Sequence, residues 1–136
     1  MKLVSFLEQN KEQLGLYIDN KIYNLAKASN NKLPDNMSDF LKQGESAMNQ
    51  AKSIENNIKE EKLIIPASAA TEKDLLAPVP HPTSCRDGYA FRQHVFAARR
   101  NRGVEMIAEF DEYPIFYFTN HNAIQGPGVI ECMPDH

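Results

Sequence analysis

Apolar and polar positions alternate at the start of the chain in a pattern that predicts three short β-strands. The expected strands run from Lys2 to Leu7, from Leu14 to Ile18 and from Lys21 to Leu25. The last two flank Asp19-Asn20, residue types that tolerate a positive φ and suit a tight hairpin turn, although the glycine preferred at the second position is missing. We therefore expect a small antiparallel meander.

A helical period follows the meander. Ser38 is a good N-cap, and Asp39 falls in the first turn, where the helix dipole favours negative charge. We expect the helix to run to about Glu60, slightly weakened by Gly44. Apolar residues at steps of three and four place one stripe along it: Phe40, Leu41, Ala47, Met48, Ala51, Ile54 and Ile58. The stripe predicts packing on the meander, and a helix that binds a partner is the alternative.

Prolines separate this region from the rest of the chain. The segment from Lys62 to Ile65 predicts one more strand. After it, prolines that cannot continue a helix mark an extended connection: Pro66, Pro78, Pro80 and Pro82. We predict an amino-terminal domain of residues 1–66, a connection of residues 67–82 and a second domain that begins at residue 83.

The composition changes beyond the prolines, since all four histidines lie after residue 80. A helix is expected from about Phe91 to Arg100, and the run from Pro114 to Asn120 is rich in β-forming residues. The stretch from Asn122 to Gly128 predicts a loop, because it contains Gly-Pro-Gly.

Length and charge narrow the class of protein. The chain has 136 residues, of which 42% are hydrophobic and 24% charged, so at least one core is expected. A formal net charge of −3 gives no broad attraction to phosphate backbones or anionic lipid, which argues against nucleic acid or membrane as the main partner. We find neither an apolar run long enough for a membrane span nor a secretory signal, and only two cysteines, which favours a cytoplasmic protein with reduced thiols.

The stretch CRDGYAFRQHV, residues 85 to 95, concentrates candidate chemistry. Asp87 and His94 are seven residues apart, so they lie on one helical face if the stretch is a helix. The other arrangement has Asp87 at the end of a strand and His94 in the first turns of a helix, both directed into one cleft. Either geometry suits a carboxylate that holds a hard divalent cation and an imidazole that takes a proton from water, with Tyr89 bonded to an oxyanionic substrate.

A purely structural interpretation of the same residues stands beside this one. Asp87 would then be a turn or cap residue, His94 a satisfied histidine under a helix, and Tyr89 a core residue with its hydroxyl at the surface. Two further groups are weaker. A zinc-type set of His81, Cys85, His121 and Cys132 lacks a recognised spacing. The basic run of residues 98–102 is either a solvated helix end or a binder of a carboxylate.

The stretches LLAPVPHPTSCRDGYAFRQHV and YPIFYFTNHNAIQGPGVIECMP together resemble the fumarylacetoacetate hydrolase family over about residues 75 to 134. Eukaryotic-type hydrolases of that family carry Asp-x-Tyr-x-x-Arg-Gln-His. Its defined positions are occupied here by Asp87, Tyr89, Arg92, Gln93 and His94. Many bacterial relatives have Asn-Tyr-x-x-His instead, so the resemblance favours the hydrolase branch.

The resemblance implies roles for these residues. Asp87 would be one carboxylate ligand of a Mg or Ca ion, Tyr89 a substrate contact and His94 the general base that activates water. The family hydrolyses a carbon–carbon bond in small β-diketone and oxo-acid substrates. A substrate-binding arginine shortly after the histidine is also implied, with the register open between Arg99, Arg100 and Arg102.

The resemblance also implies a fold class and a state. The fold expected is α+β: a small amino-terminal domain with antiparallel strands and one long helix, then the beginning of a mixed β-sandwich roll that forms homodimers when full length. The family continues with a Glu-x-Glu pair, an Asp and a Lys, whereas this sequence stops at His136. We therefore expect a truncated catalytic domain, a weakly bound cation, no activity in this chain alone, and an exposed aromatic run at residues 115–118.

Other functions remain open on the sequence. A decarboxylase, an isomerase or an acylpyruvase of the same superfamily would share these motifs. A natural short product that binds a ligand or a partner without chemistry is the alternative from another class.

Overall fold

A computed structural model describes residues 1–130 of the chain. They form two compact units: residues 1–81 together with the segment that begins at Ile124, and residues 82–123. The architecture is mixed α+β, with antiparallel sheets and one long helix, as the sequence predicts. Within this part of the chain no helix has the length and apolar character needed to cross a membrane.

A three-stranded antiparallel sheet forms the centre of the first unit. Its strands are β1 (Leu3–Glu8), β2 (Lys11–Ile18) and β3 (Lys21–Asn24), in that spatial order. The predicted meander is therefore confirmed, although β2 begins three residues before Leu14, the expected start. A short helix, α1 (Leu25–Ala28), continues directly from β3.

Two-residue turns join these strands. Both residues have a positive φ in each turn, 53° and 61° at Gln9-Asn10 and 48° and 60° at Asp19-Asn20. This is the geometry whose twist matches that of paired strands. The hairpin predicted at Asp19-Asn20 is confirmed, and Asn20 takes the position where glycine is preferred because asparagine tolerates the left-handed region.

The long helix α2 (Met37–Lys59) packs against one face of the sheet. Its side of the core is formed by Phe40, Ala47 and Ala51, all buried. Leu41 was predicted to share this stripe, but it is 51% exposed, because Phe40 fills the core position in that turn. The rest of the core cluster comes from β2 and from the segments around α1: Leu14, Leu16, Ile18, Leu25, Leu33 and Met37.

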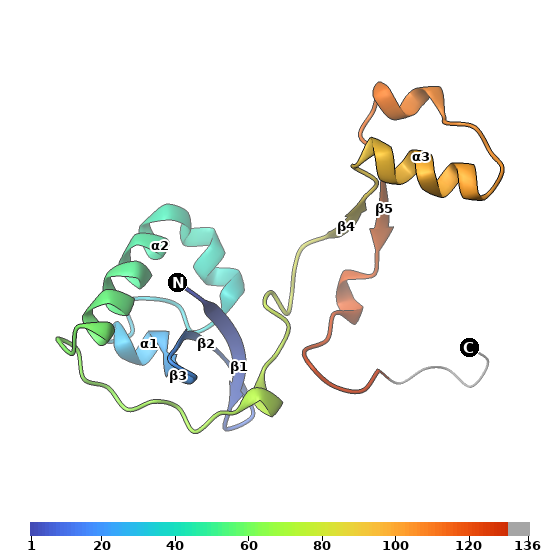
Figure 1. Cartoon of the computed structure of the whole chain (residues 1–136). Helices are drawn as coiled ribbons and strands as arrows, with labels where there is room; N and C mark the ends of the chain where they lie inside the picture. The colour runs from blue at the N-terminus through green and yellow to red at the C-terminus, as the bar shows by residue number, and fades with distance from the viewer. Residues whose placement is uncertain (131–136) are drawn as a thin grey trace. The chain divides into compact units, whose positions relative to one another are not determined.

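The start and the middle of α2 differ from the prediction. Asn36, and not Ser38, is the N-cap, since its Oδ1 accepts a hydrogen bond from the backbone N–H of Asp39 at 2.9 Å. Gly44 does more than weaken the helix: its φ of 59° and ψ of −134° break it into two segments, and Figure 1 shows the resulting bend. Nothing lies within 4 Å of a Cβ built at Gly44, so backbone conformation alone requires glycine there.

The strand expected from Lys62 to Ile65 is absent. The backbone N–H of Leu63 instead donates to the Asn57 carbonyl at 3.0 Å and closes the end of α2. The chain then reaches the β3 edge of the sheet, where the backbone N–H of Ser68 donates to the Ile22 carbonyl at 2.7 Å. It passes through the short 3₁₀-helix η1 (Glu72–Asp74) and reaches β1, where Leu75 bridges to Phe6.

The second unit is smaller and more open. Strand β4 (Cys85–Gly88) pairs antiparallel with β5 (Phe116–Thr119), and helix α3 (Arg92–Asn101) follows β4. Two 3₁₀-helices complete it, η2 (Ala108–Asp111) and η3 (His121–Ala123). The helix and the β-strand predicted from residues 91–100 and 114–120 are confirmed. All four side chains of β5 are exposed.

Gly15 is expected to tolerate no side chain. A Cβ atom there would lie 2.8 Å from Cγ2 of Ile22 and 2.9 Å from Cε1 of Phe6, which is buried. We predict that Gly15→Ala lowers the free energy of unfolding by about 1–3 kcal/mol in urea titrations, because neighbouring core side chains must shift. Gly88→Ala is the control, since its Cβ would meet only Ala90 Cβ at 4.0 Å, and an equal loss in both variants would contradict the packing argument.

Glu8 should make the first unit sensitive to acid. Lys27 donates to its Oε2 at 2.6 Å and is the main reason that the pKa of Glu8 lies below its ordinary value of 4.5; Ser68 also donates, and burial opposes the shift. A depressed carboxyl pKa stabilises the fold above about pH 4.5, and this stabilisation is lost as the pH falls through the folded-state pKa.

We expect Glu8→Gln to reduce the free energy of unfolding at pH 7 by up to about 1 kcal/mol, because Lys27 is largely exposed. The difference from the unchanged protein should shrink as the pH falls below about 4.5 and vanish once Glu8 is protonated in the folded state, as measured by urea unfolding across pH. Glu45→Gln, on the exposed side of α2, is the control. A Glu8→Gln difference that persists at low pH would show that its effect is not electrostatic.

Candidate functional site

The sequence-predicted site residues lie along a strand, a short link and a helix of the second unit. Asp87 is the third residue of β4, exposed, and its Cα is opposite that of Tyr117 on β5. Tyr89 follows the strand, and its N–H donates to the Ile115 carbonyl at 2.9 Å, so the backbone pairing extends one residue further. Side chains alternate across a strand, which gives Asp87 and Tyr89 one face of the β4–β5 ribbon.

The opposite face of the ribbon carries an arginine and two aromatic rings. The guanidinium of Arg86 lies 5.3 Å from the ring centroids of both Phe116 and Phe118. Those two rings meet edge to face at 5.1 Å. Phe118 is 74% exposed, so this face is apolar and open.

His94 lies in the first turn of α3 and is exposed. The helix is fixed by the next residue, Val95, which is fully buried and whose N–H donates to the Phe91 carbonyl at 3.0 Å. Of the two geometries left open by the sequence, the strand followed by a helix is therefore the one observed, while the common cleft of Asp87 and His94 stays a prediction. The single-helix alternative is wrong, because Asp87 belongs to β4.

The structural interpretation of these residues holds only in part. Tyr89 is half-buried and packs edge-on against Phe110 at 6.2 Å and against Tyr117 at 6.4 Å, which agrees with a core role for its ring. Asp87 is a strand residue and not a cap, and His94 is exposed and not buried under the helix. The side chains of Asp87 and His94 are thus available to solvent.

Two residues of η2, Phe110 and Asp111, contact the link between Asp87 and His94; we call this pair of contacts the brace. Phe110 packs against the Tyr89 ring with an interplanar angle of 84°. Its neighbour Asp111 accepts two hydrogen bonds from Arg92, at 2.9 and 3.1 Å. The bonds from Arg92 hold the pKa of the Asp111 carboxyl below its ordinary value, and the same pair raises the pKa of Arg92. Arg92 is a position of the Asp-x-Tyr-x-x-Arg-Gln-His pattern, and here it orients the first turn of α3.

The basic run at the end of α3 is partly used by the fold. The Nε of Arg99 donates to the backbone carbonyl of Glu105 and ties the helix end to the loop that follows. Arg100 and Arg102 are exposed. Of the three arginines predicted as candidates for a carboxylate contact, these two keep their guanidinium groups in solvent.

Metal-ligand residues do not gather in the part of the chain that the structure describes: residues 1–130 contain no group of three or more His, Cys, Asp or Glu that could hold an ion. His81 of the zinc-type set belongs to the first unit, where its Nε2 lies 3.2 Å from a Glu12 carboxylate oxygen. Cys85 is half-buried on β4 and His121 lies in η3. Cys132 falls outside the described residues.

Comparisons with known proteins neither support nor oppose the resemblance. No protein-family model matches the chain, and the search of curated proteins gives no significant match.

If the Arg92–Asp111 ion pair orients the start of α3, exchanging the two residues should preserve the positions of Tyr89 and His94. Arg92→Asp or Asp111→Arg alone should shift the NMR resonances of the Tyr89 ring and of the His94 amide, because each variant sets like charges against each other across the η2 contact. The double exchange should bring these resonances back toward their original positions. Arg100→Asp, on the exposed end of the same helix, is the control. Single variants with unchanged Tyr89 and His94 resonances would show that the pair does not orient the helix.

Proposed function

We propose that the chain belongs to the fumarylacetoacetate hydrolase family and carries part of the site of a hydrolase for carbon–carbon bonds in small β-diketones or oxo acids. In this proposal His94 is the general base, Tyr89 a substrate contact and Asp87 a ligand of Mg or Ca. The observation that supports it is the continuous strand, link and helix over residues 85–101, on which the residues of the pattern occur in order.

The residues that are present suit part of this chemistry. An imidazole is the side chain best able to take a proton from water near neutral pH. His94 is exposed on the first turn of α3, so it can exchange that proton with solvent. The Tyr89 ring is fixed between Phe110 and Tyr117, which limits the directions open to its hydroxyl as a donor to a substrate oxygen.

The described residues do not fit a complete metal site. Mg and Ca ions take about six or more oxygen ligands. Asp87 offers one carboxylate, and residues 1–130 gather no group of three candidate ligands. We therefore expect weak cation binding by this chain, in the millimolar range, and derive no reaction step from a bound metal.

The proposal extends to location and assembly. A cytoplasmic enzyme that forms a homodimer accords with the proposed family. Exposed aromatic side chains on β5 favour a covering partner for this strand, since an open edge with apolar side chains tends to associate. The same exposure is the observation that favours the second candidate function, a non-catalytic chain that binds a partner.

Binding of a small β-diketone acid tests the proposal. We expect 2,4-dioxopentanoate with Mg²⁺ to shift the NMR resonances of the Tyr89 and His94 rings, and Asp87→Asn to raise the Mg²⁺ concentration needed for this by about tenfold or more, because a charged ligand is lost. Any hydrolysis, followed by loss of the β-diketone absorbance, should fall by about 10²-fold or more in His94→Gln.

Glu112→Gln is the matched control, since Glu112 is an exposed carboxylate of the same unit outside the motif. Three results would count against the proposal: shifts that map outside residues 85–101, a Mg²⁺ requirement unchanged by Asp87→Asn, and turnover unchanged by His94→Gln. Micromolar Mg²⁺ binding by this chain would contradict the weak, incomplete cation site.

A further inference from the structure

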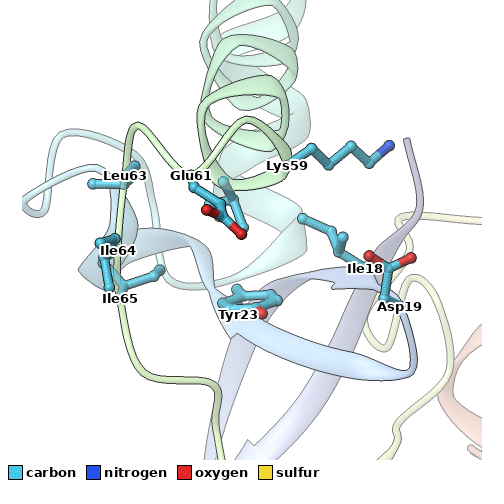
Figure 2. Close-up of a pocket in the computed structure, with 9 residues that line it drawn as sticks. Ile18, Asp19, Tyr23, Lys59, Glu61, Leu63, Ile64 and Ile65 are labelled. Atoms are coloured by element: carbon cyan, nitrogen blue, oxygen red, sulfur yellow. The ribbon is translucent and has the colours of Figure 1, made fainter.

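A cavity of about 390 Å³ lies in the first unit, between the β2–β3 hairpin and the carboxyl end of α2. Figure 2 shows the Tyr23 ring on the sheet side of this space, with the residues that follow α2 along one flank. Its apolar lining comes from Ile18, Tyr23, Ile58, Leu63 and Ile65. The volume is within the range of about 300–1,000 Å³ that is usual for small-molecule sites.

The cavity exists because the helix stops before the sheet is fully covered. α2 ends at Lys59, and Glu61 takes a left-handed conformation, with a φ of 56°, that turns the chain away. The residues after it form no strand beside β3, so Tyr23 stays only partly covered, next to the buried Ile18. At the mouth, Ile64 is 89% exposed, an aliphatic side chain that the fold itself leaves uncovered.

Charged groups at the mouth favour a cation. Asp19 and Glu61 both line the cavity, and neither forms an ion pair within residues 1–130. In Figure 2 the Glu61 side chain reaches from the end of α2 into the space above the Tyr23 ring. Two carboxylates beside an apolar space would repel an anionic ligand and attract an ammonium group.

Lys59 is the one cationic residue of the lining, and its ammonium group forms an ion pair with Glu55. Its Nζ lies 2.9 Å from Oε1 of Glu55, whose side chain is only 9% exposed. Oε2 of Glu55 also lies 3.7 Å from the α-ammonium of Met1, in the depression next to the cavity. Lys59 and the α-ammonium of Met1 share the Glu55 carboxylate, which does not line the cavity. Asp19 lines both the cavity and the depression that holds Met1 and Lys59, so Glu61 is the carboxylate that remains for a ligand.

We propose that this cavity binds a primary arylalkylamine. The aromatic body packs on Ile18, Ile58 and the face of Tyr23, while the ammonium group binds Glu61 at the mouth and Asp19 adds negative potential from the other side of the cavity. The site uses only residues 18–65, so it is independent of the hydrolase proposed for the second unit.

Phenethylamine is the probe, titrated into the full chain and followed by NMR. We expect saturable shifts at Ile18, Tyr23 and Ile58, and binding that weakens as salt is raised, because the attraction is electrostatic. 3-Phenylpropionate has a similar aromatic body with the opposite charge, and it should not bind. Glu61→Gln should weaken phenethylamine by about tenfold, since an ionic hydrogen bond becomes a neutral one.

Glu60→Gln is the matched control, because Glu60 is the adjacent carboxylate, pairs with Lys62 and does not line the cavity. Its affinity should equal that of the unchanged chain. Should Glu61→Gln fail to fold, Asp19→Asn tests the negative potential of the cavity and should weaken phenethylamine by a smaller factor of about twofold to threefold, since asparagine suits the positive φ of that turn. The proposal is overturned by an absence of phenethylamine binding, by equal binding of 3-phenylpropionate, by shifts that cluster elsewhere, or by unchanged affinity in the folded carboxylate variant.

Discussion

The burial of a three-stranded sheet on both faces is the constraint on which the first unit depends. Leu14, Leu16 and Ile18 alternate along β2 and lie under α2, while Phe6 and Ile22 are buried on the side of the chain that returns after α2. Three strands with one covered face are near the lower limit for a stable sheet in water. Residues 66–78, which cover the second face of the sheet, are therefore as necessary to the fold of this unit as α2 is.

The same arrangement explains the cavity beside Tyr23. A helix that covers a twisted sheet protects only the length that it spans, and α2 ends at Lys59 above the β2–β3 hairpin. The chain then has to reach the other face of the sheet, so it turns sharply at Glu61. Packing and connectivity together create an apolar space whose mouth is lined by carboxylates.

Local patterns predicted the elements well, and non-local contacts set the limits of that prediction. The hairpin at Asp19-Asn20 and the long helix each depend on residues close in sequence. The strand with Asp87 was one of two alternatives, because it forms by pairing with β5, where Asp87 lies opposite Tyr117. The Arg92–Asp111 pair joins residues 19 positions apart, and no periodicity marks such a contact in advance.

The individual errors have equally specific causes. Ser38 and Asn36 are both good caps, so only the hydrogen bond to Asp39 distinguishes them. Gly44 was expected to cost helix stability, but its positive φ, invisible in the sequence, breaks α2 outright. The apolar run at Leu63 to Ile65 has the composition of a strand. The backbone N–H of Leu63 instead donates a hydrogen bond to the Asn57 carbonyl at the end of α2. In each case a competing hydrogen bond or a single backbone angle decided the outcome.

The second unit poses the opposite problem, because few of its side chains are buried. Val95 is the one hydrophobic residue of the core that lies between residues 82 and 123, and the order of the motif depends on pairwise contacts such as Tyr89 with Phe110. Asp87 and His94 face water, where charges are screened and a carboxylate holds a cation weakly. Efficient hydrolysis needs a site from which water is largely excluded. A further layer over β5 would bury the aromatic side chains of the ribbon and lower the dielectric around the motif, so the proposed hydrolase and the exposed strand would both gain from such a layer.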